Sequence, residues 1–585
     1  MKRTHSCGAL RRADIGKKVV LCGWIAARRD HGGLIFIDLR DREGVTQLVF
    51  NPEVDKKLLM NARSLKSEFV VEVTGEVTRR PNGTENPKLP TGEVEVLAKE
   101  LKILNPSLTP PFEIADDIKI SEDLRLTYRW LDLRRPWMQR NLKERHRATQ
   151  LIRGFLDKGG FIEVETPALT KSTPEGARDY LVPSRLNPGK FYALPQSPQL
   201  FKQIMMVAGF ERYFQIARCF RDEDLRRDRQ PEHTQIDIEM SFIDREDIFD
   251  LVERMLVKLF KQMLGVKLKR PFRRITYHEA MSRFGTDKPD PRFGMELVDV
   301  THIVKEADFK VFKDVIKDGG LVKGINAKGC SRYSSRELER LTEFVGTYGA
   351  KGLAWFKVVK HGLSSPIAKF FEARTLASVA AAMKAEVGDL LLFVAAKEDI
   401  VGGSLSQLRL HLANELNLIP KGSYELTWVL DFPLLEWNED EQRYQSRHHP
   451  FTSPVDEDVG LLSAEPAKVK AKAYDLILNG IEIGGGSIRI HKEEVQQKAF
   501  EALGIGSKEA RKRFGFLLEA LKYGAPPHGG IALGLDRLLM IMLNLATIRD
   551  VIAFPKTQKA ICLMTGAPAE VEPKQLKELS LTVKA

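Results

Sequence analysis

Two β-strand patterns joined by a highly charged loop, at 213–221 and 234–242, restrict the possible folds of this 585-residue chain most strongly. In the second pattern, apolar residues alternate with polar ones that include Asp237 and Glu239, which is the period of a strand with two different faces. We expect Arg221, Asp237 and Glu239 to lie on the face away from the core. A charged face on a central sheet is costly unless its charges pair with one another or meet a ligand. The pattern therefore predicts either an internal network of ion pairs or a ligand-binding surface.

Three further stretches combine charged residues with glycine or a helical turn. In YDLILNGIEIGGGSIRIH, Asp475 and Glu482 are placed to approach one divalent ion across a strand or turn, because oxygen ligands suit Mg²⁺. The three glycines that follow permit close backbone approach, and Ser487 and Arg489 share one face of the strand. The stretch lacks the GxxxxGK[ST] pattern of a Walker loop, and a simple bulge is the alternative interpretation.

In GGIALGLDRLLMIML, a strand of small residues leads through a glycine turn to Asp536 and Arg537 at the start of a helix. This turn is suited to placing Arg537 over a phosphate, and the alternative is a buried helix start capped by Asp536. In LPQSPQLFKQ, Gln199 and Lys202 lie three apart, on one side of a helical turn.

The composition indicates a globular protein with a polyanionic partner. A net charge of +12 and a pI near 9.2 favour nucleic acid as that partner, with a solvated basic face as the alternative. No apolar run approaches the roughly 18–20 residues of a membrane span, and the N-terminus lacks the apolar segment of a signal peptide, so we expect a cytoplasmic location and no membrane partner.

The five scattered cysteines form no CxxC pair, which indicates reduced thiols. His448 and His449 have no partner at ligand spacing, which argues against zinc.

The periodicity of the chain changes several times along its length. The N-terminal part holds five β-patterned runs with a short helical stretch after the third, which fits an OB-type barrel. The expected domains are an OB barrel at 1–104, a linker at 105–135, alternating strands and helices at 136–285 and 421–555, an inserted domain at 286–420 and a C-terminal extension at 556–585.

Three stretches in order strongly resemble the motifs of the class II aminoacyl-tRNA synthetases, and more closely those of the bacterial aspartyl-tRNA synthetases. GGFIEVETPAL, with Gly160 and Pro167, is similar to motif 1, CFRDED to motif 2, and GLDR, which ends in Arg537, to motif 3. The likeness runs over essentially the whole chain and includes RQPEHTQID, HHPFTSP and GGGSIRIH. By this resemblance, 1–104 corresponds to an anticodon-binding domain and 286–420 to the GAD domain of the bacterial enzymes.

The resemblance implies an α+β multidomain fold with an N-terminal OB-type β-barrel, a class II antiparallel sheet flanked by helices and an inserted α+β GAD-like domain. It also implies a homodimer that uses ATP, Mg²⁺, L-aspartate and tRNA. Aspartate and ATP would react to aspartyl-adenylate, and the aspartyl group would pass to the 3′ adenosine of the tRNA. Such chemistry depends mostly on positioning groups and neutralising charge.

The resemblance assigns roles to individual residues as well. The expected catalytic residues are Arg221, Glu482 and Arg537, and the expected Mg²⁺ ligands are Asp475 and Glu482. The expected aspartate-binding residues are Glu175, Gln199, Leu200, Phe201, Lys202, Arg221, Asp237, His448 and Arg489. The expected ATP-binding residues are Arg221, Asp222, Glu223, Gln230, Glu482, Gly534, Leu535, Asp536 and Arg537. Two cations on one side-chain carboxylate, Lys202 and Arg489, favour aspartate over neutral asparagine, because an unpaired buried charge is penalised.

Two residues of the barrel bear on which tRNA is charged. His31 in RRDHGG and Gly83 in RRPNGTENPKLPTGE are similar to the pattern of bacterial enzymes that charge both tRNA-Asp and tRNA-Asn. Enzymes restricted to tRNA-Asp more often carry RRDLG at the first site. We expect this surface to read the third anticodon base and both tRNAs to be charged, with restriction to tRNA-Asp as the alternative. A separate amidotransferase would then convert the aspartate on tRNA-Asn to asparagine.

Two other classes compete with this interpretation. A catalytically inactive tRNA-binding paralogue would be expected to lose Arg221, Glu482 or Arg537, and all three are present. An asparaginyl- or lysyl-type synthetase is the nearer alternative. The pair of Lys202 and Arg489 and the large insertion argue against it.

Overall fold

The computed structural model describes residues 3–173 and 177–583, which fall into two compact units. The first unit holds the chain up to His146 together with Leu225–Arg227 and Ala546–Glu570. The second holds Arg147–Asp224, Asp228–Leu545 and the chain from Val571 onward. Within the described ranges, no helix is both long and apolar enough to cross a membrane.

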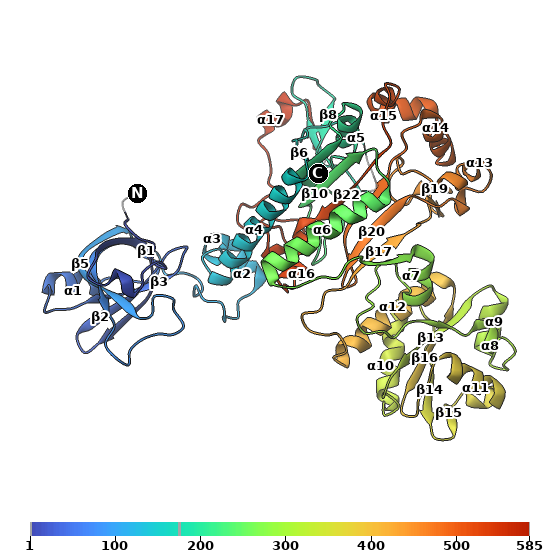
Figure 1. Cartoon of the computed structure of the whole chain (residues 1–585), viewed down its shortest axis with the longest axis horizontal. Helices are drawn as coiled ribbons and strands as arrows, with labels where there is room; N and C mark the ends of the chain where they lie inside the picture. The colour runs from blue at the N-terminus through green and yellow to red at the C-terminus, as the bar shows by residue number, and fades with distance from the viewer. Residues whose placement is uncertain (1–2, 174–176, 584–585) are drawn as a thin grey trace. The chain divides into compact units, whose positions relative to one another are not determined.

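Five strands of the first unit close into a barrel (Figure 1). They are β1 (Lys18–His31), β2 (Leu34–Arg40), β3 (Val45–Phe50), β5 (Val94–Asn105) and β4 (Val70–Arg79) in barrel order, with α1 (Lys56–Arg63) after β3. Every second residue of β4 is buried, so that Val71, Val73 and Val77 fill the interior, as a small closed barrel requires. Asp55 caps α1 by accepting hydrogen bonds from the N–H groups of Lys57 and Leu58. The predicted OB-type barrel is confirmed.

The segment predicted as a linker is irregular only in its first part. Residues 106–121 form no helix or strand, whereas α2 (Glu122–Thr127) and α3 (Arg129–Asp132) follow directly and lead to α4 (Pro136–Lys158). Arg129 is buried and donates to the carbonyl oxygens of Arg549 and Ile552 at 3.0 and 2.9 Å. These bonds fix α3 within the first unit.

The second unit is built on an eight-stranded sheet. Its strands, in spatial order, are β11 (Arg273–Thr276), β17 (Leu426–Leu430), β20 (Ala473–Leu478), β21 (Ile481–Ile488), β22 (His528–Gly534), β10 (Glu232–Ser241), β9 (Arg212–Phe220) and β6 (Ile162–Glu163). All neighbours are antiparallel except at the two edges, where β11 pairs with β17 and β6 with β9 in parallel. The predicted antiparallel sheet flanked by helices is confirmed, although the motif 1 strand is only two residues long.

One face of this sheet is apolar and covered by α6 (Arg245–Leu264), the long green helix in Figure 1. The ring of Phe249 lies 4.4 Å from that of Trp428 and 5.2 Å from that of Tyr474, measured between centroids. All three side chains are buried, so this face provides much of the apolar area that stabilises the unit.

The opposite face of the eight-stranded sheet carries carboxylates that pack directly against glycine residues of neighbouring strands. The register across β10, β22, β21 and β20 places Asp237 and Asp475 in one row. A Cβ atom on Gly485 would collide with an oxygen of Asp475, and one on Gly530 would collide with an oxygen of Glu239. Glycine is therefore required at both positions for the carboxylates to lie flat on the sheet.

The hairpin of β9 and β10 agrees with the predicted alternation but corrects it in two respects. Both strands end one residue earlier than predicted, at Phe220 and Ser241, and Phe242 has a φ of +60° and is 69% exposed. Asp237 and Glu239 lie opposite the apolar face as predicted, but they are fully buried, since α5 (Gln199–Val207) packs over β10.

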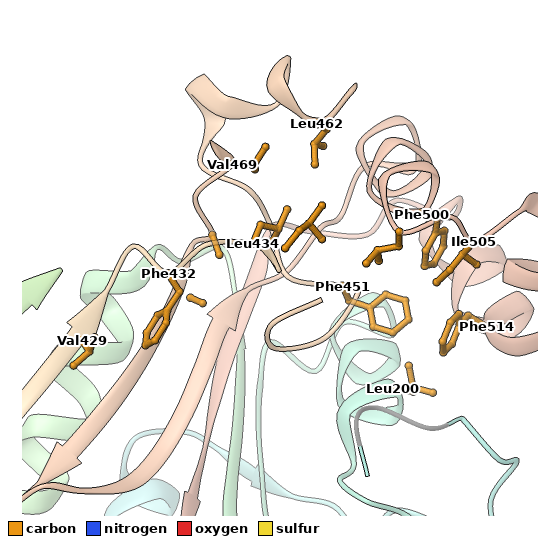
Figure 2. Packing of buried hydrophobic residues seen from close by; sticks show 14 of the residues in the cluster. Leu200, Val429, Phe432, Leu434, Phe451, Leu462, Val469, Phe500, Ile505 and Phe514 are labelled. Atoms are coloured by element: carbon orange, nitrogen blue, oxygen red, sulfur yellow. The ribbon is translucent and has the colours of Figure 1, made fainter. Parts of the chain in front are cut away.

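A hydrophobic cluster supports α5 and the segment after His449 (Figure 2). Phe451 meets Phe514 edge-on at 5.0 Å between ring centroids, and Phe500 stacks on Phe514 at 5.9 Å. The last two side chains come from α14 (Glu493–Ala502) and α15 (Ser507–Leu521). Leu200 of α5 joins the same cluster, which fixes the position of its helix neighbour Lys202.

Between α7 (Tyr277–Phe284) and β17, the chain forms a separate five-stranded sheet (yellow-green in Figure 1). Its strands, in spatial order, are β12 (Val298–Asp299), β13 (Leu321–Ala327), β16 (Leu390–Ala396), β14 (Ala354–Val359) and β15 (Gly362–Ser364). Its helices are α8 (Thr301–Val304), α9 (Lys310–Lys317), α10 (Ser335–Gly346), α11 (Ala373–Ala382) and α12 (Glu398–Glu415). The second unit also contains β7 (Leu181–Pro183), β8 (Phe191–Ala193), β18 (Leu435–Asn438), β19 (Arg443–Ser446), α13 (Leu461–Ala464), α16 (Leu535–Met542) and α17 (Pro573–Glu578).

Candidate active site

Four charged side chains, Lys202, Asp237, Glu239 and Arg489, form a closed cluster on the polar face of the large sheet, which we call the charged quartet. The ammonium group of Lys202 lies 2.8 Å from Oδ1 of Asp237 and 3.2 Å from Oε2 of Glu239. Arg489 donates from Nε and Nη2 to the two oxygens of Glu239 at 2.9 and 3.0 Å. None of the four side chains is more than 2% exposed. The predicted internal network of ion pairs is therefore present on this face of the sheet.

Burial and pairing act in opposite directions on the acids of the quartet. Burial raises the pKa of Glu239, but Arg489 and Lys202 outweigh it and lower that pKa to about 2. Burial also raises the pKa of Asp237, and here Lys202 opposes it without reversing the shift. Oδ2 of Asp237 is buried and has no hydrogen-bond partner among the described residues. Glu239 is thus a fixed anion, whereas Asp237 retains an unsatisfied oxygen.

The two adjacent histidines occupy different places. Nε2 of His449 lies 2.6 Å from Nη1 of Arg489, which also donates to Oγ of Ser487 at 2.8 Å. Burial and then the charge of Arg489 hold the pKa of His449 well below its ordinary value, so the imidazole is neutral. His448, one of the expected aspartate-binding residues, lies 3.6 Å from Oδ1 of Asp475.

Asp475 and Glu482 lie on neighbouring strands, β20 and β21, as their spacing predicted. Burial, and after it the charge of Asp475, raise the pKa of Glu482, which indicates two carboxylates with too little positive charge between them. Such a pair of oxygen ligands fits Mg²⁺. No group of three or more His, Cys, Asp or Glu side chains able to hold a metal occurs in the described part of the chain, so water or substrate would supply the other ligands.

The turn from β22 into α16 places Arg537 beside this carboxylate pair. Arg537 donates to the backbone oxygen of Glu482 at 3.1 Å and pairs with Asp228 at 3.2 Å. Asp536 does not cap its own helix; it accepts a hydrogen bond from the N–H of Thr234 at 2.8 Å. Asp536 and Leu535 are buried, so their side chains contribute to packing at this turn.

Arg221 follows β9 and keeps a partly exposed guanidinium. It donates to the carbonyl oxygen of Gln196 at 3.3 Å and lies 3.9 Å from Glu223, which pairs more closely with Arg229 at 2.5 Å. Asp222 is bridged to Arg178 through the backbone. The side chain of Arg221 is 36% exposed, so it can turn toward a ligand at low cost.

The predicted residues on α5 separate into two groups. Gln199 and Lys202 are buried on the side that faces the sheet, and Nε2 of Gln199 has no hydrogen-bond partner among the described residues. Leu200 packs into the hydrophobic cluster, and Phe201 lies 6.5 Å from Phe516 between ring centroids. Both line a cavity of about 540 Å³ that Gln196, Ser197 and Phe516 also line. Gln230 is buried next to Arg229, and the predicted residue Glu175 lies outside the described residues.

The two predicted tRNA residues lie in the barrel. His31 ends β1 and is exposed. Gly83 has a φ of +86° in the turn between β4 and β5, where a Cβ atom would meet nothing within 4 Å. The basic end of β1 is partly neutralised, because Arg29 forms two hydrogen bonds with Asp38 at 2.7 and 2.9 Å.

The barrel, the antiparallel sheet and the site on it define a class of proteins. Over residues 121–558 the chain matches the family described as tRNA synthetases class II (D, K and N), and over residues 19–104 it matches the OB-fold nucleic acid binding domain. The chain belongs to the class II tRNA synthetases of this group.

Its relatives are similar over their full length. The aspartate–tRNA(Asp/Asn) ligase of Caldanaerobacter subterraneus subsp. tengcongensis is 60% identical over 583 residues, which cover 100% of this chain and 98% of that protein. The aspartate–tRNA(Asp/Asn) ligase of Syntrophotalea carbinolica is 58% identical over 581 residues, covering 99% and 98% of the two chains.

Solved structures share the fold at lower identity. Asparaginyl-tRNA synthetase from Pyrococcus horikoshii, complexed with asparaginyl-adenylate, has a TM-score of 0.61 at 20% identity and covers 98% of this chain and 100% of its own. Aspartyl tRNA synthetase from Entamoeba histolytica has a TM-score of 0.55 at 18% identity, covering 93% and 89%.

Proposed function

We propose that the chain is an aspartate–tRNA ligase that charges both tRNA-Asp and tRNA-Asn in the cytoplasm. The observation that carries the proposal is the charged quartet, in which two buried cations lie beside an unsatisfied Asp237 oxygen and an unsatisfied Gln199 amide. The relatives named aspartate–tRNA(Asp/Asn) ligase support it over the whole chain.

The quartet would select the amino acid. The side-chain carboxylate of aspartate would bind Lys202 and Arg489, with Asp237 orienting Lys202 and Gln199 contributing to the ammonium site. Asparagine has the same shape but no charge, so the two buried cations would be left with less negative charge around them. His449 and Glu239 hold Arg489 in place and were missed by sequence reasoning, although the strand alternation that marked Asp237 also marks Glu239.

The other end of the site would hold ATP. Arg221 would contact the α-phosphate and the α-carboxylate, and Arg537 would bind the γ-phosphate. Glu223 and Gln230 would hold ATP, with Gly534, Leu535 and Asp536 lining the adenosine side. Asp475 and Glu482 would hold Mg²⁺, which neutralises phosphate charge when bound. An oxygen of the aspartate α-carboxylate attacks the α-phosphorus, the bond to the bridging oxygen breaks, and pyrophosphate leaves. The ribose hydroxyl at the 3′ end of tRNA then attacks the aspartyl carbonyl, and AMP leaves.

The remaining assignments concern tRNA and assembly. We assign anticodon binding to 1–104, with His31 and Gly83 near the third anticodon base, and a GAD-like domain to 286–420. A homodimer is part of the proposal, and the exposed Ile162 of the edge strand β6, at 49%, is compatible with it. Sedimentation of the purified protein at twice the monomer mass is the expected result.

The decisive experiment measures pyrophosphate exchange into ATP with aspartate, asparagine and lysine in parallel. Exchange with aspartate alone is the expected result, and equal exchange with asparagine would reject the assignment. Charging of tRNA-Asp and tRNA-Asn transcripts side by side then tests the dual specificity. Product on tRNA-Asp alone would restrict the enzyme to one tRNA.

A further inference from the structure

Lys288, which follows α7 at the start of the inserted region, comes within ion-pair distance of the carboxylate pair. Its ammonium group lies 3.6 Å from Oε2 of Glu482 and 3.6 Å from Oδ1 of Asp287. Asp287 in turn lies 3.4 Å from Arg447, whose guanidinium packs over the ring of Tyr277 at 4.5 Å. Lys288 belongs to none of the predicted motifs. Its ammonium group faces the part of the site around Glu482 and Arg537 where the phosphates of ATP are proposed to bind, which we call the phosphate end.

The loop that carries Lys288 is held by the inserted domain. Arg409 of α12 is buried and donates to the carbonyl oxygens of Asp290, Gly294 and Met295 at 3.0, 2.6 and 3.2 Å. Burial lowers the pKa of Arg409 to about 10, so it remains a cation at neutral pH. Three carbonyl groups held by one guanidinium fix the path of the loop.

Glu482 thus has a cation on each side. Arg537 donates to its backbone oxygen at 3.1 Å, and Lys288 faces its carboxylate. The side chains of Lys288 and Arg537 are 43% and 24% exposed, so both can be reached from solvent. An exposed ammonium 3.6 Å from a carboxylate is only weakly held, and a polyphosphate offers it stronger acceptors.

We infer that Lys288 binds the β- and γ-phosphates of ATP and is positioned to do so by the inserted domain. The inference rests on the proposed function and extends it by one substrate-binding residue. When ATP enters, the ammonium group of Lys288 leaves Glu482 for a phosphate oxygen, and the carboxylate of Glu482 would then be free to hold Mg²⁺. No covalent bond changes in this step.

The test is direct binding of ATP and AMP, measured by titration calorimetry in the presence of Mg²⁺. Lys288→Met removes the charge and keeps the length of the side chain, and Lys288→Arg keeps the charge. We expect Lys288→Met to weaken ATP binding about 10- to 100-fold, the range of one charge-assisted hydrogen bond. AMP binding should be unchanged, and Lys288→Arg should recover most of the ATP affinity. Unchanged ATP affinity, or equal losses for ATP and AMP, would overturn the inference.

Two further variants and an activity control distinguish the failure of this inference from the failure of the proposed function. Lys313→Met, at an exposed lysine of the same domain that pairs with Asp308 at 2.7 Å, should bind ATP as the unmodified protein does. Arg409→Met should weaken ATP but not AMP, and an unchanged ATP affinity would reject the role given to the inserted domain. If the unmodified protein fails to exchange pyrophosphate with aspartate, the proposed function fails. If it does exchange but Lys288→Met binds ATP normally, only this inference fails.

Discussion

The charged side chains at the two ends of the site differ in how deeply they are buried and how closely they are paired. In the charged quartet, Lys202 and Arg489 are each 2% exposed and already paired with carboxylates of the same chain. At the other end, where we propose that the phosphates of ATP bind, Glu482 and Lys288 are 32% and 43% exposed and lie 3.6 Å apart. The first end is assembled before any ligand arrives, whereas the second holds its charges loosely.

This difference fits what each end would bind. An amino acid side chain must be distinguished from a neutral isostere, which requires fixed, desolvated partners whose positions do not adjust. A polyphosphate carries several charges and must leave as pyrophosphate, so partly solvated cations that can change partners suit it better. We therefore expect substitutions in the quartet to affect stability strongly, and substitutions at the phosphate end to affect binding and rate with little effect on stability.

The largest effect is expected from Arg489→Met. It leaves Glu239 buried with only Lys202 as a partner, and breaking a buried ion pair on one side costs about 3–5 kcal/mol. The free energy of unfolding in urea measures the loss, and Lys472→Met is the matched control. Lys472 pairs with Asp456, which is 82% exposed, so the control should lose at most about 1 kcal/mol. Equal losses in the two variants would mean that the quartet is no more important for stability than a surface pair.

Arg221→Ala should produce the next largest effect, which we expect in the rate of pyrophosphate exchange and not in stability. The guanidinium is 36% exposed and makes one hydrogen bond at 3.3 Å, so its removal should change stability by less than about 0.5 kcal/mol. Loss of a hydrogen-bond donor at the reacting phosphate should lower the rate about 10²- to 10³-fold. Aspartate-dependent pyrophosphate exchange measures this, with Arg254→Ala, at an exposed pair on α6, as the control. Retained exchange would make the charges at the end of β9 structural.

The pH dependence of stability should show a smaller effect of Glu239. Its folded pKa of about 2 lies below the unfolded value of about 4.3. The associated stability is therefore present above about pH 4.5 and is lost as the pH falls toward 2. Between pH 6 and 3.5 the expected loss is about 1 kcal/mol.

Urea unfolding over this pH range gives the free energy of unfolding as a function of pH. We expect its slope against pH to be steeper in the unmodified protein than in Glu239→Gln. The exposed Glu465→Gln, at a surface pair with Lys468, should keep the slope of the unmodified protein. If Glu239→Gln also keeps the slope of the unmodified protein, Glu239 is not the source of this pH dependence.

Local pattern was enough to predict the strands and the polar face. Alternation along 234–242 identified β10 and the shared face of Asp237 and Glu239. Asp475 and Glu482, which were expected to approach one ion across a strand or turn, lie on the paired strands β20 and β21. These features depend on residues that are close in sequence, for which the two-residue period of a strand is sufficient.

Long-range pairing was not predictable in the same way. Glu239 meets Arg489 only because β22 lies between β10 and β21, and no local pattern reports the order of strands in a sheet. The contact of His449 with Arg489, forty residues away in sequence, is likewise set by the path of a loop that has no local pattern. Lys288 lies in a segment with no periodicity and reaches Glu482 through a loop fixed by Arg409, more than a hundred residues away in sequence.

Asp475→Asn should have the smallest effect on stability and makes the sharpest test of the comparison. Removing this charge relieves its repulsion of Glu482, whose pKa is raised by burial and then by Asp475, so stability should stay within about 0.5 kcal/mol of the unmodified protein or rise slightly. The Mg²⁺ concentration that half-saturates pyrophosphate exchange should increase, because one oxygen ligand has lost its charge. Asp456→Asn, at the exposed pair with Lys472, should leave both quantities unchanged. A loss of several kcal/mol in Asp475→Asn would place Asp475 with the quartet as a structural charge, and the contrast between the two ends would no longer hold.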